Sequence, residues 1–177
     1  AFTAAIEPLR MANRLSGKRL YQWTTYTVDG NAVTASNGLE IQPDAAITDV
    51  AGLDTLFVCS GLDVERACDR ATLSWLKKLG QQRMNFGALC TGAHVLARAG
   101  LLDGYRCTLH WENIASMREA FPRVVVSYEL FEIDRDRFTS AGGTAPLDMM
   151  LNLITQQIGS DTATAISEAF ACERIRE

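Results

Sequence analysis

The sequence predicts an α/β protein in which helices cover both faces of a mostly parallel sheet. Short apolar runs alternate with loops and amphipathic helical segments along the chain. The run 54–59 is dominated by apolar residues and ends at Ser60-Gly61, as expected of a parallel strand buried on both faces. We therefore expect a flavodoxin-like three-layer sandwich, with its functional site at the carboxyl ends of the strands.

The elements of the first half follow from local patterns. Apolar positions Leu73, Leu76 and Leu79 give residues 70–79 one packing face, and Asn37-Gly38 marks a tight turn. The elements expected here are a helix over 4–16, a strand over 21–28, a hairpin of 33–36 with 39–42, the strand 54–59 and the helix 70–79.

The second half continues the alternation. A strand through Phe86 leads to Cys90 and a helix that ends at Gly100. After it we expect a strand over 107–109, a helix ending near Phe121, strands over 124–133 and 137–140, a helix over 145–158 and a last helix over 161–173 with Asp161 as its N-cap. Ile166, Ala169 and Phe170 form an apolar stripe on this last helix, which makes it the candidate surface for self-association.

Composition limits the classes of function. With 177 residues, 47% of them hydrophobic, the chain is long enough to form one globular domain with a buried core. Its net charge of −4 and pI near 5.2 argue against this chain gripping nucleic acid unaided. Five cysteines without CxxC spacing suggest neither a zinc site nor a disulfide framework. We therefore expect no metal, no cofactor and no membrane span, and a reducing cytoplasm as the location.

The most informative segment surrounds Cys90. An apolar run breaks at this cysteine into a helical segment, and the residues two positions away, Ala88 and Gly92, are small. This is the pattern of a nucleophile elbow, a strained strand-to-helix turn that tolerates only small neighbours. The helix N-terminus would favour a thiolate and lower the cysteine pKa. The alternative is that Cys90 is a small buried hydrophobe.

These motifs resemble the PfpI-like domain of the class I glutamine amidotransferase-like superfamily, and in particular that domain in AraC-family transcriptional regulators. The opening 6–17 and the ending 173–177 resemble regulators of amino-acid and quaternary-amine catabolism. The motifs that carry the resemblance are Gly87-Ala88-Leu89-Cys90-Thr91-Gly92-Ala93, the segment 96–104, Thr108-Leu109-His110-Trp111, and Thr139-Ser140-Ala141-Gly142-Gly143 with Leu147-Asp148.

The resemblance implies a domain organisation. Residues 1–177 would form one sensor domain, the family's first strand would precede Ala1, and two helix-turn-helix units would follow Glu177. An open position in the sheet is then expected. The implied function is that of an effector-sensing and dimerising domain that binds a small metabolite, such as an amino acid or a quaternary amine. DNA would be bound only through the helix-turn-helix region.

The candidate ligand-binding residues are expected around a pocket with Cys90 at its mouth. Gly61 and Thr91 would offer backbone N–H groups to an anion, Trp111 a cation–π wall, and Glu7 a carboxylate. The alternatives are a simple turn glycine, a packed tryptophan and a carboxylate that stabilises the first turn of its helix. The full candidate set is Glu7, Gly61, Leu62, Cys90, Thr91, His110 and Trp111.

A second class of function is a cysteine-dependent hydrolase or hydratase, in which Cys90 would be the nucleophile and His110 its partner. The family's acid position falls on Ala1, and Thr91 stands where peptidase-like members have histidine. Both departures favour recognition over catalysis. His94, four residues beyond Cys90, is expected to be a packed or surface histidine.

Overall fold

The computed structural model describes residues 1–50, 52–82 and 84–171. Its centre is a four-stranded sheet in the order β5-β6-β10-β9. Three strands run parallel and only β9 is antiparallel to its neighbour β10, so the expected mostly parallel sheet is confirmed. The bounds are β5 (Thr55–Ser60), β6 (Asn85–Cys90), β9 (Phe131–Asp134) and β10 (Arg137–Ser140).

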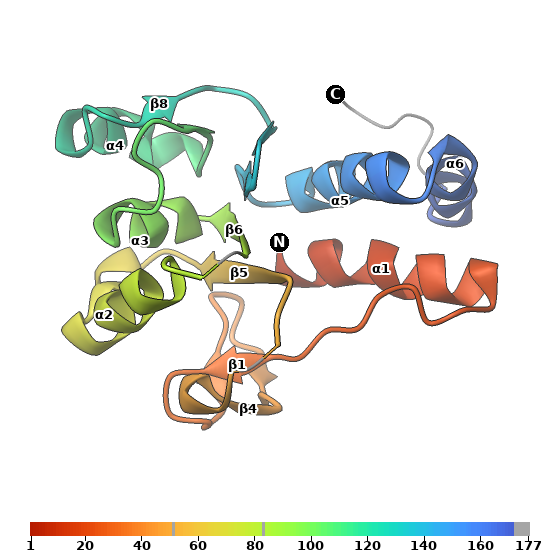
Figure 1. Cartoon of the computed structure of the whole chain (residues 1–177), viewed down its shortest axis with the longest axis horizontal. Coiled ribbons are helices and arrows are strands. Elements are labelled where there is room, and N and C mark those ends of the chain that lie inside the picture. Colours follow the sequence, from red (N-terminus) through yellow and green to blue (C-terminus); the bar gives the residue numbers. More distant parts are fainter. Residues whose placement is uncertain (51, 83, 172–177) are drawn as a thin grey trace.

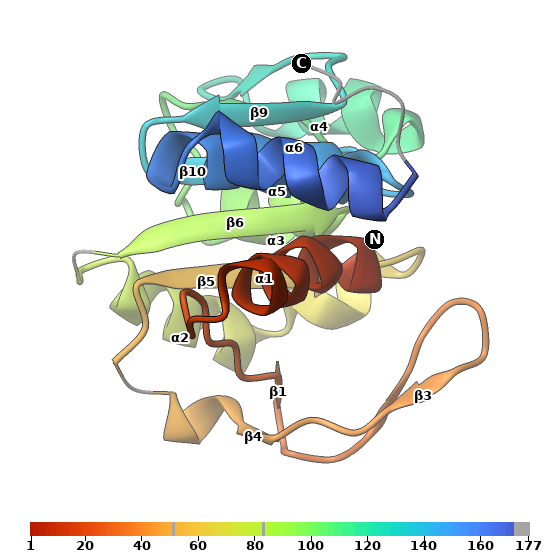
Figure 2. The ribbon, with the colours of Figure 1, turned by 90° about the vertical axis from the view of Figure 1, so that its right-hand side faces the viewer.

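Helices cover both faces of this sheet, as Figures 1 and 2 show from two directions. One layer contains α2, α3 and α4, and the opposite layer contains α1, α5 and α6. The three-layer sandwich is thereby confirmed. The helices are α1 (Phe2–Ser16), α2 (Arg70–Leu79), α3 (Gly92–Arg98), α4 (Ile114–Ala120), α5 (Ala145–Gln157) and α6 (Ser160–Ala169).

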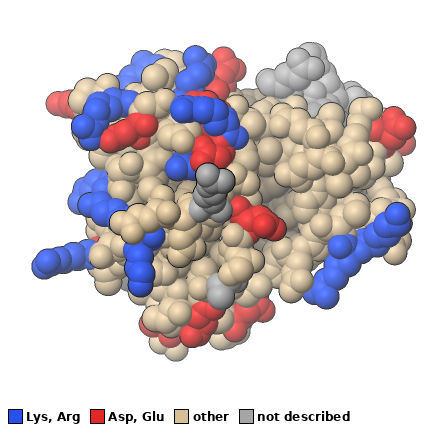
Figure 3. Space-filling model, viewed as in Figure 1, with Lys and Arg blue, Asp and Glu red and all other residues tan. Residues whose placement is uncertain are grey.

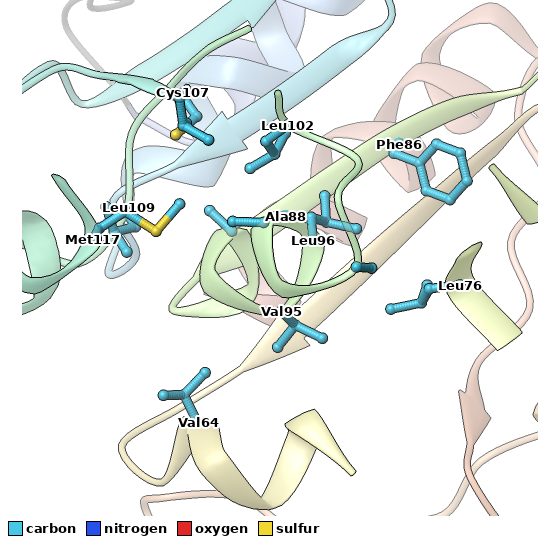
Figure 4. Packing of buried hydrophobic residues seen from close by; sticks show 14 of the residues in the cluster. Val64, Leu76, Phe86, Ala88, Val95, Leu96, Leu102, Cys107, Leu109 and Met117 are labelled. Atoms are coloured by element: carbon cyan, nitrogen blue, oxygen red, sulfur yellow. The ribbon is translucent and has the colours of Figure 1, made fainter. Parts of the chain in front are cut away.

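Strand alternation divides the core between the two layers. On β6, Phe86 and Ala88 pack with α2, α3 and α4 (Figure 4). Leu89, on the opposite face of the same strand, packs with α1 and α5. Each helix layer therefore has its own apolar contact with the sheet, which holds β6 in the middle of the molecule.

The helix α6 belongs to this packing rather than to a free surface. Ile166 has no exposed area and packs with Met11 of α1 and Leu151 and Ile154 of α5, and Phe170 packs against the same cluster. Ile166 is thus buried within its own chain and Phe170 is half-buried, whereas Ala169 is exposed, so self-association through this stripe stays a prediction. The helix also begins at Ser160, without a side-chain cap from Asp161, and residues 172–173 lie outside the described part.

The segment after α1 is less regular than expected. Instead of a strand over 21–28, only β1 (Tyr26–Thr27) forms, pairing in parallel with β4 (Ala45–Ala46). The backbone of Tyr21 is bonded instead to the Asn13 side chain, through its N–H at 2.8 Å and its carbonyl at 2.7 Å. The expected hairpin is confirmed as β2 (Val33–Thr34) and β3 (Glu40–Ile41), and the short helix η1 (Ile47–Asp49) follows β4.

The expected strand over 124–133 is two strands with different partners. β8 (Val125–Val126) pairs in parallel with β7 (Arg106–Cys107), which is shorter than the 107–109 expected. β9 pairs with β10 in the main sheet. Between them the chain leaves the ladder, and the Glu129 carbonyl accepts a hydrogen bond from the Thr108 hydroxyl at 2.8 Å. Alternation alone does not reveal such a change of partner.

The described strands do not form one continuous sheet. The β1–β4 pair is separate from the four-stranded sheet, and β5 lies at the edge of that sheet in the part of the chain described. The open position expected from the sequence stays a prediction.

Candidate functional site

The nucleophile elbow is present at the carboxyl end of β6. Cys90 ends the strand with a φ of 60°, and α3 begins at Gly92. A positive φ is uncommon for a residue with a side chain and persists only where the surroundings enforce it. The expected strained turn from strand to helix is thus confirmed.

The elbow needs its small neighbours. A Cβ atom on Gly92 would lie 2.1 Å from the carbonyl oxygen of Val58 on β5 and 3.5 Å from the Cβ of Ala88. Backbone atoms cannot approach that closely, so only glycine fits at position 92. The glycine of the sequence motif is therefore a steric requirement at the point where the start of α3 lies against β5.

The surroundings of the Cys90 thiol do not favour a thiolate. Burial raises the pKa of Cys90 above its ordinary value, and the hydrogen bond from the Thr91 N–H only partly opposes this. The expectation of a lowered pKa is not supported, because desolvation of this half-buried sulfur outweighs the hydrogen bond from the Thr91 N–H. Activation as a nucleophile would need a further positive or basic group.

The loop after β5 lies against the elbow. Ser60 pairs with Cys90 in the parallel ladder, and the Thr91 hydroxyl donates a 2.6 Å hydrogen bond to the Gly61 carbonyl oxygen. Thr91 is 3% exposed. The structure thus brings Gly61, Thr91 and Cys90 together, as expected, although the Thr91 hydroxyl is engaged within the protein.

Two other candidates lie at the surface, and His110 beside them is partly buried. Leu62 is 82% exposed and Trp111, in the short helix η3 (Trp111–Asn113), is 71% exposed. The His110 ring lies 5.9 Å from the Trp111 ring, and its Nδ1 lies 3.7 Å from a carboxylate oxygen of Glu112. No hydrogen bond joins His110 to Cys90 within the residues that the structure describes, so the geometry shows no Cys–His pair.

Glu7 is occupied by its own helix. Its carboxylate accepts hydrogen bonds from Arg10 at 2.9 and 2.7 Å, and this pairing lowers the pKa of Glu7. Because α1 begins at Phe2, Glu7 also lies beyond the first turn, so its proposed interaction with that turn is not supported.

His94 is packed, as expected, between α3 and neighbouring segments. Its side chain is 12% exposed, its ring lies edge-on to Phe121 at 5.3 Å, and neither ring nitrogen has a hydrogen bond. Glu65, in η2 (Val64–Cys68), lies 3.8 Å from Nε2. Burial lowers the pKa of His94 below its ordinary 6.5, and Glu65 only partly opposes this.

His94 is expected to make the protein less stable in acid. Because its folded-state pKa lies below 6.5, the unfolded chain binds this proton first, so the free energy of unfolding falls as the pH drops below the unfolded value. His94→Leu should lose less stability in that range, whereas Glu65→Gln, which removes the group that raises the pKa, should lose more. Urea unfolding between about pH 8 and pH 5 measures this. Parallel pH profiles for all three proteins would refute it.

The sequence reasoning missed two residues beside the elbow. Gly142, with a φ of 101°, lies so close that a Cβ on it would be 3.1 Å from the Cys90 sulfur. Ser140, at the end of β10, is fully buried and its hydroxyl has no hydrogen-bond partner. Both belong to the motif 139–143, which spans the carboxyl end of β10. Because functional side chains gather at the carboxyl ends of parallel strands, the position of this motif could have identified both residues from the sequence.

Two cavities in the described residues lie away from the elbow. One, of about 370 Å³, is lined by Asp54, Met84, Asn85 and Asp136 at the opposite ends of the strands. The other, of about 290 Å³, lies beside Phe121 and Arg123. Neither includes Cys90, so the expected pocket mouth remains a prediction.

Other kinds of site find little support within the described ranges. They contain no group of three or more His, Cys, Asp or Glu side chains that could hold a metal ion. None of the helices described there is long and apolar enough to cross a membrane.

The fold and the elbow together define a flavodoxin-like α/β protein of the kind that carries a cysteine at a strand-to-helix turn. Residues 3–156 match the DJ-1/PfpI family, and the chain belongs to that family.

Individual relatives refine this assignment. The chain is 52% identical to the HTH-type transcriptional regulator GbdR of Pseudomonas aeruginosa, over 99% of this chain and 48% of that protein. It is 34% identical to an isonitrile hydratase of Pseudomonas putida, over 76% of this chain and 58% of that protein. The crystal structure of an AraC family transcriptional regulator from Pseudomonas putida superposes with a TM-score of 0.87 at 32% identity, covering 96% of this chain and 91% of that one. The resemblance identified from the sequence is confirmed.

Proposed function

We propose that this chain is the effector-sensing domain of a cytoplasmic transcriptional regulator, and that it binds a small metabolite at the Cys90 elbow. The observation that carries the proposal is the combination of an intact elbow with an unactivated thiol. The backbone strain at Cys90 is retained, while the thiol pKa is raised and no histidine is hydrogen-bonded to the sulfur in the described residues. A site kept for recognition needs the shape of the elbow but not its nucleophile.

Similarity to named regulators supports the same proposal. The 52% identity with GbdR extends over nearly all of this chain, which spans about half the length of that relative. An amino acid or a quaternary amine remains the ligand class that we propose, as expected from the sequence.

DNA binding would belong to another region. The net charge of −4 offers little attraction for phosphate. On the face in Figure 3, Lys and Arg side chains are interspersed with Asp and Glu, so that face has no continuous basic stripe. We propose that a helix-turn-helix region outside residues 1–177 contacts DNA, that the sensor domain is homodimeric as paired half-sites require, and that a further strand beside the β5 edge completes the sheet.

The second candidate is a cysteine-dependent hydratase or hydrolase. It is favoured by the 34% identity with the isonitrile hydratase, and by the half-buried His110, which the sequence analysis named as a possible partner of Cys90. In this alternative Cys90 would attack a carbon centre, and His110 would have to move into hydrogen-bonding distance of the sulfur.

Ligand binding with and without Cys90 separates the two candidates. A panel of amino acids and quaternary amines is expected to contain a compound that raises the unfolding temperature of the protein, by the linkage of binding to folding. Cys90→Ala should change the affinity for that compound by about tenfold or less, since it removes one contact in the site. Calorimetric titration gives the affinity, and mass spectrometry of the protein and compound detects any reaction.

The regulator proposal requires that the compound is recovered unchanged and that no adduct forms on Cys90. Consumption of the compound by the wild-type protein, abolished by Cys90→Ala, would establish the enzyme instead. A variant at the exposed Cys59, Cys59→Ser, is the matched control for loss of a thiol elsewhere on the sheet.

A further inference from the structure

Thr91 makes an unusual use of its hydroxyl group. It occupies the N-cap position of α3, where a threonine side chain ordinarily accepts a hydrogen bond from a helix N–H. No such capping bond forms here. The hydroxyl instead donates across the site to the Gly61 carbonyl oxygen at 2.6 Å. The bond therefore connects the elbow to the loop after β5 rather than stabilising the helix.

A ligand has little access to this side chain. Thr91 is 3% exposed, and its proton is already donated to Gly61. The hydroxyl thus has its partner inside the protein, which argues against contact of this side chain with a ligand. Contact of a ligand with the backbone N–H of Thr91 stays a prediction.

The Thr91–Gly61 bond extends a second contact between the same segments. The Val58 carbonyl of β5 lies directly over Gly92, with no room for a side chain there. Beyond it Ser60 pairs with Cys90, and then Gly61 is bonded to Thr91. The next two positions are loosely packed, since a Cβ on Gly61 would meet no atom within 4 Å and Leu62 is largely exposed. Val64 then returns to the core, so the Thr91 hydroxyl holds the loop at the point where it leaves the sheet.

We propose that Thr91 is a positioning residue, which holds the Gly61–Leu62 loop against the elbow and so sets how closely that loop approaches the Cys90 sulfur. The proposal deepens the proposed sensor function, because it names the residue that shapes the same site. It implies that a buried hydrogen bond orders the loop before any ligand binds. Ligand binding then loses no affinity to the ordering of this loop.

The test compares substitutions that remove or keep the hydroxyl. Thr91→Val has the same shape without the donor, and Thr91→Ser keeps the donor. Thr108→Val is the matched control, because Thr108 is also buried and also donates its hydroxyl to a loop carbonyl, that of Glu129 at 2.8 Å. The rate of iodoacetamide alkylation at Cys90 is measured by peptide mass spectrometry between about pH 6 and pH 10, together with the unfolding temperature.

Thr91→Val is expected to raise the alkylation rate of Cys90 near neutral pH about fivefold, the factor that corresponds to one ordinary hydrogen bond. The pKa of Cys90 should also fall toward its ordinary value, because water enters where the loop loosens. Thr91→Ser and Thr108→Val should stay within about twofold of the wild type.

If the alkylation rate of Cys90 in Thr91→Val equals that of the wild type at every pH, the positioning role is wrong, even if the unfolding temperature changes. Thr91→Ala serves if the valine variant does not fold. Failure of both to fold, with Thr91→Ser folded, would assign the bond to overall stability and also overturn the proposal. The alkylation assay contains no effector, so a failure of the proposed function appears separately, as absent ligand binding by the wild-type protein.

Discussion

Gly92→Ala is expected to destabilise the protein by at least about 2 kcal/mol, within the usual cost of overpacking a closed site. The new Cβ would lie 2.1 Å from the Val58 carbonyl oxygen, a backbone atom of β5 that cannot rotate away. Two effects compete in this substitution. Alanine favours a helix over glycine by about 1 kcal/mol at most, and the steric conflict exceeds that gain. The strand β5 would have to shift away from the elbow.

Gly61→Ala provides the control for stability. Gly61 lies in the adjoining loop and has no positive φ, and a Cβ on it would meet no atom within 4 Å beyond its chain neighbours. We expect its substitution to change the free energy of unfolding by no more than about 0.5 kcal/mol. Urea unfolding of both variants measures the difference. Equal stability of Gly92→Ala and the wild type would mean that the elbow is not as tightly packed as the structure shows.

Arg137→Met is expected to cost about 3 kcal/mol, because Arg137 is a buried cation with several simultaneous partners. Its side chain is 9% exposed, its Nε donates to the Leu101 carbonyl at 2.8 Å, and it pairs with Asp136 at 2.8 Å. Its guanidinium also lies over the rings of Phe86 and Tyr105, at 5.0 and 4.7 Å from their centroids. Asp136 is 44% exposed and retains water, so most of the loss comes from the Leu101 carbonyl and the two ring contacts.

Arg135→Met is the matched control on the same turn. Arg135 also lies over Tyr105, at 3.8 Å, and bonds to Asp134 and to the Gly104 carbonyl. However, its side chain is 58% exposed, so water replaces much of what it loses, and we expect a much smaller loss of stability than for Arg137→Met. Chemical denaturation compares the two variants at the same pH. Similar costs would show that burial does not determine the value of these arginine contacts.

The elements that local physical chemistry controls could be predicted from the sequence. The helix α2 has the predicted bounds, since its apolar spacing is complete and Asp69 caps its start with hydrogen bonds of 2.8 and 3.0 Å. The hairpin of β2 and β3 follows from Asn37-Gly38. The strands predicted over 21–28 and 124–133 are longer than the observed ones, because β-propensity does not specify which neighbouring strand is available for pairing. The Asn13 side chain forms hydrogen bonds with the backbone N–H and carbonyl of Tyr21, and β8 and β9 belong to different sheets.

The candidate site divides in the same way. Gly61, Cys90 and Thr91 could be placed together, because successive parallel strands end at one edge of the sheet. The contact of Gly142 with the sulfur was missed, since it depends on how β10 approaches β6. The occupation of Glu7 by Arg10 was missed as well, although their spacing of three residues on a helix would have allowed it to be predicted.

The sequence by itself determined the layered α/β fold, the family and the elbow at Cys90, because each depends on the order of apolar, small and turn-forming residues along the chain. Only the tertiary structure decided the properties that depend on which distant segments meet. These are the burial of Ile166 of α6 against α1 and α5, the raised pKa of the Cys90 thiol and the hydrogen bond of the Thr91 hydroxyl to Gly61. The physical reason is that burial, desolvation and long-range hydrogen bonds are properties of the surroundings, and a local pattern does not specify those surroundings.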